Sequence, residues 1–424
     1  MQETGERRLR HWTPRGEALY CWPMSEPVAA RPQRINLRTP EVMEEVQAAV
    51  EKHYHSPLVG RLRAAGGVGQ FGDVSVRLAK QFGFCYGVER AIDLAYAARK
   101  VFADKNLYLV GQIIHNPDVN AQLAAMGIRS LTGPDQLSQI DALEAEDVVI
   151  IPAFGAEISL QERIKARGCQ IVDTTCGDVM SVWKRVRQYA NDGVTSIIHG
   201  KADHEETRAT SSRARAAGGG QGNFVVVYNL AEVDQLCQYI VGRGDRAAFL
   251  EKFQGATSEG FDPDLHLGKV GVANQTTMLR TETEEVQRRV RQGVVERDGS
   301  DENFRVFDTI CGATQERQDA LVELLKQPPD LMLVVGGYNS SNTTHLADMG
   351  QEKAPTYFIL NADSLESRKT IRHFDTLHHE EVTTGEWLPA GPVTVGITAG
   401  ASCPSNLIED VLRRLLGLRG IELA

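Results

Sequence analysis

Three cysteines in this sequence share the same local setting, and three thiols together can bind a metal. Cys85, Cys176 and Cys311 each follow a predicted strand and precede a predicted amphipathic helix. The endings DTTC at 173–176 and DTIC at 308–311 are near-copies of one another. A cysteine just before a helix faces backbone N–H groups and the positive end of the helix dipole, which favours the thiolate by only about 0.3–1 kcal/mol. We therefore expect a bound cation to hold the three thiolates together.

Two kinds of metal centre fit three thiolates without an obvious fourth cysteine. One is an iron–sulfur cluster with one open iron, and the other is a zinc site of three cysteines and one histidine. Burial of all three as small apolar side chains is the competing interpretation, and it is weaker for three matched settings than for a lone cysteine. The remaining cysteines have no such setting and are expected to be structural: Cys21, Cys169, Cys237 and Cys403.

Polar loops that follow other predicted strands would suit an anion such as a diphosphate. Hydroxyl and amide groups at the start of a helix direct donors toward an anion. For any single loop, helix capping is the competing explanation. No Walker A motif occurs, which disfavours hydrolysis of a nucleoside triphosphate. The candidate residues are Gln275, Thr276, Thr277, Ser340, Ser341, Asn342 and Ser402.

Histidines beside carboxylates add candidates for phosphate binding and proton transfer, and for any one of them alone a solvated surface role is the favoured interpretation. His115 lies in IIHNPD, and His204 lies next to Glu205 and Glu206 in HGKADHEET. TLHHEE at 376–381 is expected to be a solvated polar loop. The sequence has no HExxH motif, which disfavours a metalloprotease.

The elements that must position these residues follow from an alternation of short apolar strands and amphipathic helices after about residue 72. This alternation predicts βα units, mainly parallel sheets and an α/β fold. The predicted strands are 74–78, 107–110, 148–151, 195–199, 224–228, 269–273, 331–335, 356–360 and 393–397. The expected organisation is a poorly ordered extension at 1–34, a helical segment at 35–71, and three α/β subdomains at 72–175, 176–310 and 311–424.

Composition favours a cytoplasmic protein with several buried cores. The 424 residues are 42% hydrophobic and 24% charged, and the net charge of −10 disfavours nucleic acid as a partner. No apolar run approaches the roughly 18 residues that span a membrane, and the N-terminus lacks the order of a secretory signal. Glu3, Glu6 and Glu17 argue against a transit peptide and a plastid location.

Nine motifs, taken in order, resemble the 4-hydroxy-3-methylbut-2-enyl diphosphate reductase family, and most closely its longer branch from plants and cyanobacteria. The resemblance runs from about residue 40 to the end. It implies a trefoil of three α/β subdomains around a central [4Fe–4S] cluster, one per subunit, with Cys85, Cys176 and Cys311 as ligands and one open iron. The motifs are GFCYGVERAI, IIHNPDVN, IPAFGAEI, DTTC, IHGKADHEET, NQTTML, DTICGATQERQDA, VVGGYNSSNTTHL and GITAGAS.

The resemblance also implies roles for other residues. Glu206 matches the proton-relay glutamate, and Thr276 matches the group near the substrate hydroxyl. The implied substrate contacts are His115, His204, Gln275, Thr277, Thr314, Ser340, Ser341, Asn342 and Ser402. Two positions depart from the family pattern: Phe154 replaces a histidine of the shorter bacterial branch, and Gly177 stands where proline is usual.

The implied reaction is a two-electron, two-proton reductive dehydroxylation that yields isopentenyl and dimethylallyl diphosphates, the last step of the non-mevalonate isoprenoid pathway. Because no GxGxxG motif indicates a bound nucleotide cofactor, ferredoxin or flavodoxin is the expected electron donor. Two other readings remain: another three-cysteine enzyme, such as quinolinate synthase or the radical enzymes of diphthamide synthesis, and a non-enzymatic iron–sulfur or zinc sensor. Both a monomer and a homodimer are compatible with the sequence.

Overall fold

The fold was analysed in a computed structural model that describes residues 36–215, 220, 222–307 and 309–423. The expected N-terminal extension at 1–34, with Cys21, lies outside these residues, as does Asp308 of the DTIC ending. The described chain from Asn36 onward belongs to one structural unit. None of its helices is long and apolar enough to cross a membrane.

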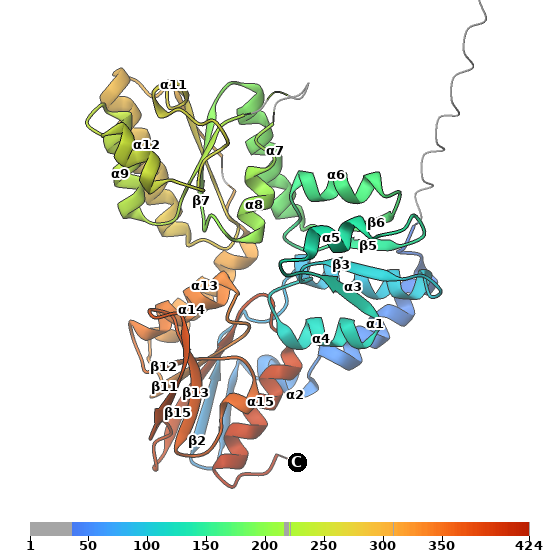
Figure 1. Ribbon diagram of the computed structural model, residues 1–424. Helices are drawn as coiled ribbons and strands as arrows, with labels where there is room; N and C mark the ends of the chain where they lie inside the picture. Colours follow the sequence, from blue (N-terminus) through green and yellow to red (C-terminus); the bar gives the residue numbers. More distant parts are fainter. Residues whose placement is uncertain (1–35, 216–219, 221, 308, 424) are drawn as a thin grey trace, which may run out of the picture. The chain divides into compact units, whose positions relative to one another are not determined.

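Three β-sheets divide this unit into three α/β lobes (Figure 1). The first sheet is parallel, in the order β4 (Ile128–Leu131), β3 (Leu107–Val110), β5 (Val148–Ile151) and β6 (Gln170–Asp173). The second is also parallel, in the order β10 (Phe304–Val306), β9 (Val270–Asn274), β7 (Thr195–His199) and β8 (Phe224–Val227).

The third sheet is mixed and has seven strands. Its centre is parallel, and its outer pairs are antiparallel. The order is β1 (Val68–Phe71), β2 (Val74–Leu78), β15 (Val393–Ala399), β11 (Leu331–Val335), β12 (Thr356–Ile359), β13 (Thr370–Asp375) and β14 (Glu380–Gly385).

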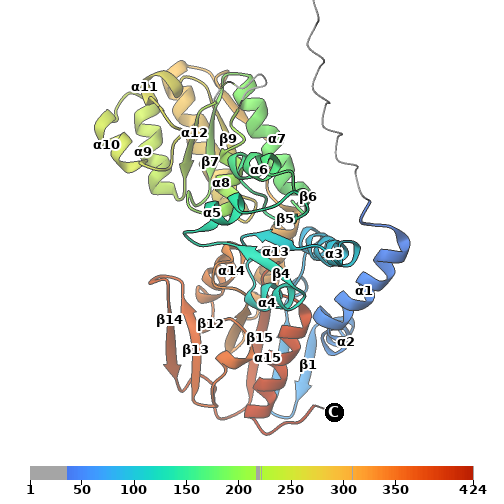
Figure 2. The same ribbon diagram turned by 45° about the vertical axis from the view of Figure 1, so that its right-hand side comes forward.

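Helices cover the sheets (Figures 1 and 2). The N-terminal pair is α1 (Pro40–Tyr54) and α2 (Pro57–Ala64), and α1 packs on the first lobe. The first lobe contains α3 (Tyr86–Val101), α4 (Pro117–Ala125), α5 (Gln136–Asp141) and α6 (Ile158–Ala166). The second contains α7 (Gly177–Asn191), α8 (Glu205–Ser211), α9 (Leu230–Ile240), α10 (Arg246–Lys252), α11 (Pro263–His266) and α12 (Arg280–Asp298). The third contains α13 (Gly312–Leu325), α14 (Ser341–Gln351), the 3₁₀ turn η1 (Ala362–Ser364) and α15 (Ser405–Leu418).

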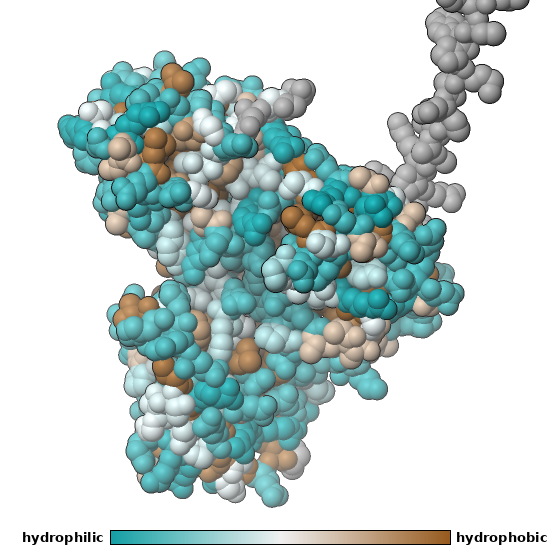
Figure 3. Space-filling model, in the orientation of Figure 1, coloured by the Kyte–Doolittle hydropathy of each residue, from teal (hydrophilic) through white to brown (hydrophobic). Residues whose placement is uncertain are grey.

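Burial on both faces explains why the central strands are continuous apolar runs. In β5, Val148 and Ile150 pack into a core with α1, α3 and α4. Val149 and Ile151 point to the other face and pack against α5 and α6. Because a parallel strand with helices on both sides has no solvated face, alternation of polar residues disappears. The expected α/β class with mainly parallel sheets is confirmed. The face of the molecule in Figure 3 is largely hydrophilic, with scattered apolar residues.

The nine predicted strands are all present, within one or two residues of their expected ends. The strands expected before Cys176 and Cys311 are β6 and β10, and four further strands of the described chain were not predicted: β1, β4, β13 and β14. Three of these are sheet edges, where polar side chains break the apolar pattern. TLHHEE was expected to be a polar loop. It forms the turn of the β13–β14 hairpin, and its last two residues, Glu380 and Glu381, already belong to β14.

Strand β2 belongs to the third lobe rather than to the first subdomain, which was expected to start at residue 72. It pairs in parallel with β15, and Val74, Val76 and Leu78 are buried in the third core. The chain therefore crosses from the third sheet to the first lobe after β2. It crosses again after β6 and after β10, and one of the three cysteines lies at each crossing.

Candidate functional site

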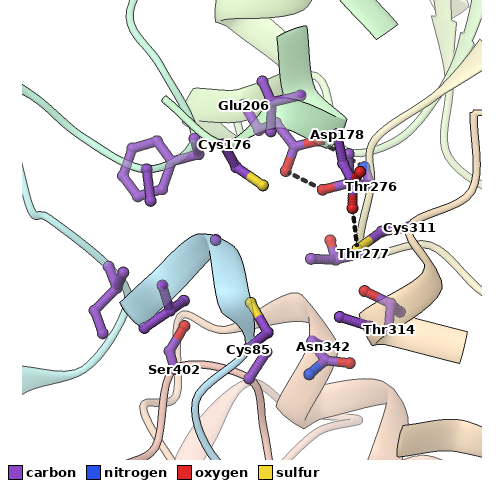
Figure 4. A pocket seen from close by; sticks show the side chains of 18 of the residues that line it. Cys85, Cys176, Asp178, Glu206, Thr276, Thr277, Cys311, Thr314, Asn342 and Ser402 are labelled. Atoms are coloured by element: carbon purple, nitrogen blue, oxygen red, sulfur yellow. Dashed lines mark hydrogen bonds between the residues drawn. The ribbon is translucent and has the colours of Figure 1, made fainter. Parts of the chain in front are cut away.

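The three cysteines converge on one cavity at the points where the chain passes between lobes. Cys85, Cys176 and Cys311 are the N-cap residues of α3, α7 and α13. All three line a cavity of about 100 Å³, and their sulfur atoms point into the same space (Figure 4). Cys169, Cys237 and Cys403 instead pack against separate apolar cores.

Burial opposes ionisation of two of the three thiols, those of Cys176 and Cys311. Burial raises the pKa of Cys176, and it raises the pKa of Cys311 to about 12, although backbone N–H groups at the helix starts act in the opposite direction. The Cys311 thiol donates a hydrogen bond to Asp178 Oδ2 at 3.0 Å. The helix N-termini are thus too weak to create thiolates alone, and a metal would have to displace the protons.

The spacing of the thiols fits a centre larger than one ion. Around a tetrahedral zinc ion, with Zn–S distances of about 2.3 Å, sulfur ligands lie about 3.8 Å apart. Among the described residues, the three cysteines do not form a group whose ligand atoms all lie within 4.8 Å of one another. Three thiolates around a wider space suit an iron–sulfur cluster.

Gly87 allows two of the cysteines to approach each other. A Cβ atom at Gly87, in the first turn of α3, would lie 2.5 Å from Cys176 Sγ and 3.9 Å from Cys85 Sγ. Any larger residue at position 87 would collide with the sulfur of Cys176, which follows strand β6 of the first sheet. Gly177 and Gly312 follow the other two cysteines, but an added Cβ would meet nothing within 4 Å at either position. At Gly177, where proline is usual in the family, the Cβ atom of a larger residue would therefore touch nothing.

Glu206 is buried in the wall of the cavity and bonded to Thr276. The Thr276 backbone N–H donates to Glu206 Oε1 at 2.6 Å, and the Thr276 hydroxyl donates to Oε2 at 2.9 Å (Figure 4). Burial raises the pKa of Glu206 to about 7, outweighing these hydrogen bonds, which lower it. The carboxyl group can therefore carry a proton near neutral pH.

Gln275 lies behind the cavity wall and holds its neighbours. Its side-chain oxygen accepts hydrogen bonds from the Lys201 backbone N–H and the Thr207 hydroxyl. Its Nε2 donates to Thr277 Oγ1 at 2.7 Å and to Ser341 Oγ at 3.2 Å. Thr277 and Ser341 line the cavity, whereas Gln275 itself does not.

Two histidines present ring nitrogens to the cavity. His204 Nδ1 accepts the Glu206 backbone N–H at 3.1 Å, so the neutral ring carries its proton on Nε2. Burial lowers the pKa of His204 to about 3 and also lowers that of His115. Nε2 of each ring is buried without a hydrogen-bond partner in the described structure. Phe154 stacks on His115 with ring centres 4.7 Å apart.

His115, His204 and Glu205 also lie close enough to share a metal ion. Nδ1 of His204 is occupied by a backbone donor, however, so Nε2 keeps its proton and offers no lone pair to a metal. An N–H that points into the cavity suits an anion instead.

The start of α14 combines capping with free polar groups. Ser340 is the N-cap residue, and its hydroxyl oxygen accepts a hydrogen bond from the Thr343 backbone N–H, so this hydroxyl group has a helix-capping role. Both polar atoms of Asn342 are buried without a partner in the described structure. The cavity is also lined by Ser402 and Thr314, and its apolar wall consists of Val88, Ile114, Phe154 and Val179.

Asp178 and Gly87 are parts of the site that the sequence patterns did not indicate. Asp178 follows Cys176 by two positions, which identifies it as a neighbour but not as a partner of Cys311. Gly87 follows Cys85 by two positions, and nothing local requires glycine there. The Asp178–Cys311 contact arises only when the second and third lobes meet, and the Gly87–Cys176 contact only when α3 packs against the end of the first sheet.

Fold and site together define a class: three-lobed α/β proteins with one cavity lined by three cysteines from the crossings between lobes. The sequence matches the family described as LytB protein over residues 76–416. Proteins named 4-hydroxy-3-methylbut-2-enyl diphosphate reductase are 46% identical to it in Thermosynechococcus vestitus, over 89% of this chain and 93% of that protein, and 46% identical in Gloeobacter violaceus, over 89% and 91%.

A solved structure of the E-1-hydroxy-2-methyl-but-2-enyl-4-diphosphate reductase from Plasmodium falciparum has the same fold. Its TM-score is 0.57 at 21% identity, over 80% of this chain and 87% of that one. The chain belongs to the 4-hydroxy-3-methylbut-2-enyl diphosphate reductase, or LytB, family.

Proposed function

We propose that this protein reduces 4-hydroxy-3-methylbut-2-enyl diphosphate to isopentenyl and dimethylallyl diphosphates with release of water, the last step of the non-mevalonate pathway. One observation carries the proposal. A single cavity contains three convergent thiols, a buried carboxyl group with a pKa of about 7, and unpaired donors for an anion. Family membership names the substrate class.

Cys85, Cys176 and Cys311 would hold a [4Fe–4S] cluster with one open iron. When bound, this cluster supplies a Lewis acid for the substrate hydroxyl and a route for electrons. The protein's own residues select, orient and protonate the substrate. The apolar wall of Val88 and Ile114 would border the hydrocarbon part of the substrate.

Glu206 is the proposed proton donor to the departing hydroxyl oxygen. Its carboxyl group is protonated below a pH of about 7, because burial and, to a smaller degree, the negative charge of Asp178 raise its pKa. The Thr276 hydroxyl can donate to a carboxylate or accept from a carboxylic acid, so Thr276 keeps Glu206 in position in both states.

The diphosphate is proposed to lie between the α14 start and the histidines. His204 Nε2–H and the Asn342 amide offer unpaired donors, and His115, Ser341, Ser402 and Thr277 line the same space. Ser340 and Gln275 position this set, and Thr314 borders it. Neutral donors that are buried and already oriented bind an anion with little reorganisation.

Ferredoxin or flavodoxin remains the proposed electron donor, and the cytoplasm the proposed location. The alternative three-cysteine enzymes and the metal sensor predict a loaded cluster without turnover of this substrate. An assay of the anaerobically purified protein therefore separates them from the proposed reductase.

The test combines an iron count, the cluster's visible absorbance and substrate turnover after anaerobic purification. Replacing Cys85, Cys176 or Cys311 by serine should abolish both the absorbance and turnover, because each supplies one of three ligands. Cys169→Ser is the matched control and should retain both, since Cys169 packs in a separate core. Full activity of Cys176→Ser would refute the proposal.

A further inference from the structure

Arg317 is a buried arginine that joins two of the cysteine-bearing turns. It lies on α13 and is 3% exposed. Its Nε and Nη2 donate to the Gly83 carbonyl at 3.2 and 2.6 Å, and its Nη1 donates to the Ala313 carbonyl at 2.7 Å. Gly83 precedes Cys85 by two positions, and Ala313 follows Cys311 by two. One side chain therefore fixes the relative position of two ligands from different parts of the chain.

The positive charge of Arg317 has no carboxylate partner within ion-pair distance among the described residues. Its hydrogen bonds all go to neutral carbonyl groups. Burial lowers the pKa of Arg317, and thiolates at Cys85 and Cys311 would oppose this effect more than Glu316 and Glu89 do. An unpaired buried charge is costly, so a buried guanidinium normally faces an anion. Cys85 and Cys311, whose turns Arg317 joins, would supply such an anion as thiolates bound to a metal.

We propose that Arg317 is the counter-charge of the centre held by the three cysteines and a positioning residue that makes its one-electron reduction easier. The inference rests on the proposed function, because it takes that centre to be an iron–sulfur cluster. Three thiolates give such a centre net negative charge, and an added electron makes it more negative. A buried cation nearby stabilises the reduced form more than the oxidised form, and low polarity around it strengthens the effect.

The test is a redox titration of the loaded protein, followed by electron paramagnetic resonance. Arg317→Met should reduce the equilibrium constant for one-electron reduction at least tenfold, which is a shift of about 59 mV to more negative potential. Arg317→Lys keeps the positive charge, so its equilibrium constant for one-electron reduction should stay within threefold of that of the unmodified protein. If Arg317 had a purely structural role, its replacement would lower the iron content of the protein but would leave the reduction potential of the remaining cluster unchanged.

Arg213→Met is the matched control. Arg213 is 5% exposed and donates to the Ala156 carbonyl at 3.0 Å, and no cysteine is among the charges that act on it. Loss of Arg213 should leave the equilibrium constant for one-electron reduction within threefold of that of the unmodified protein. An unchanged potential in Arg317→Met, or an equal shift in Arg213→Met, would overturn the proposal.

Arg317→Gln provides a second variant in case the methionine variant does not fold, since an amide still donates to a carbonyl but carries no charge. It should shift the potential in the same direction, and no shift would count against the counter-charge role. An unmodified protein that binds no iron would defeat the proposed function itself. A cluster whose potential ignores residue 317 would defeat only this inference.

Discussion

A carboxyl group enclosed by protein, as Glu206 is, holds its proton to a higher pH than a carboxyl group in water, because burial disfavours the charged form. The two hydrogen bonds from Thr276 favour the carboxylate, yet burial is the larger effect and the pKa rises to about 7. At the residue scale, the site thus combines an acid that is ready near neutral pH with neutral imidazoles, since burial lowers the pKa of His115 and His204.

We expect Glu206→Gln to retain the cluster but to lose about 10²-fold or more in turnover, the usual scale for a missing general acid. The pKa of Glu206 is raised, so the acid form is present below about pH 7 and is lost as the pH rises through that value. The kcat/KM of the unmodified protein should decline along this limb. The Glu206→Gln variant should show no such decline in kcat/KM above about pH 7. Equal pH profiles of the two proteins would remove Glu206 from the mechanism.

At the element scale, the first turn of α3 is shaped by a cysteine from another part of the chain. Gly87 leaves room for Cys176 Sγ, which would lie 2.5 Å from an added Cβ. The helix itself would tolerate or prefer alanine at this position, since glycine destabilises a helix by about 0.5–1 kcal/mol. Glycine is therefore explained by the approach of the sulfur rather than by the backbone.

Gly87→Ala should lower the iron bound per chain, because the new methyl group displaces the Cys176 sulfur. Gly312→Ala is the matched control: it also lies in the first turn of a cysteine-capped helix, but its added Cβ meets open space. Iron content and cluster absorbance of the two purified variants give the comparison. Equal iron content would show that Cys176 can shift without loss of the metal.

At the scale of the whole molecule, the three lobes are separate α/β layers that share one cavity. Each cysteine lies at a crossing between lobes, so a centre bound to all three would connect the lobes directly. The Cys311–Asp178 hydrogen bond and the Arg317 contacts also span parts of the same junction. Both are weak substitutes for metal–sulfur bonds.

Removal of the metal should lower the midpoint temperature of unfolding, because a ligand that binds only the folded chain stabilises it by mass action. Anaerobic thermal unfolding before and after chelation measures the difference, and reconstitution should restore it. Cys176→Ser should show little dependence on added iron and sulfide. A midpoint that is the same with and without metal would mean that the lobes are held together by protein contacts alone.

Much of the fold was predictable because its signals are local. Apolar runs such as VVII at 148–151 and LMLVV at 331–335 are buried parallel strands, and nine such runs appear where expected. The three strand–cysteine–helix patterns were also visible, since strand ends and helix starts depend on neighbouring residues. The polar hairpin of β13 and β14 was missed because its stability comes from pairing with β12 and not from an apolar pattern.

By itself, the sequence determined the α/β class, the family and which cysteines, histidines and hydroxyl groups were candidates. Only the tertiary structure decided that β2 joins the third sheet and that Gln275 lies behind the wall. It also decided that Asp178 and Gly87 meet cysteines from elsewhere in the chain, and that Arg317 donates to the Gly83 carbonyl near Cys85. Strand and helix patterns are set by residues a few positions apart. Contacts between lobes, and the burial that shifts the pKa of Glu206, depend on atoms brought together by the complete fold.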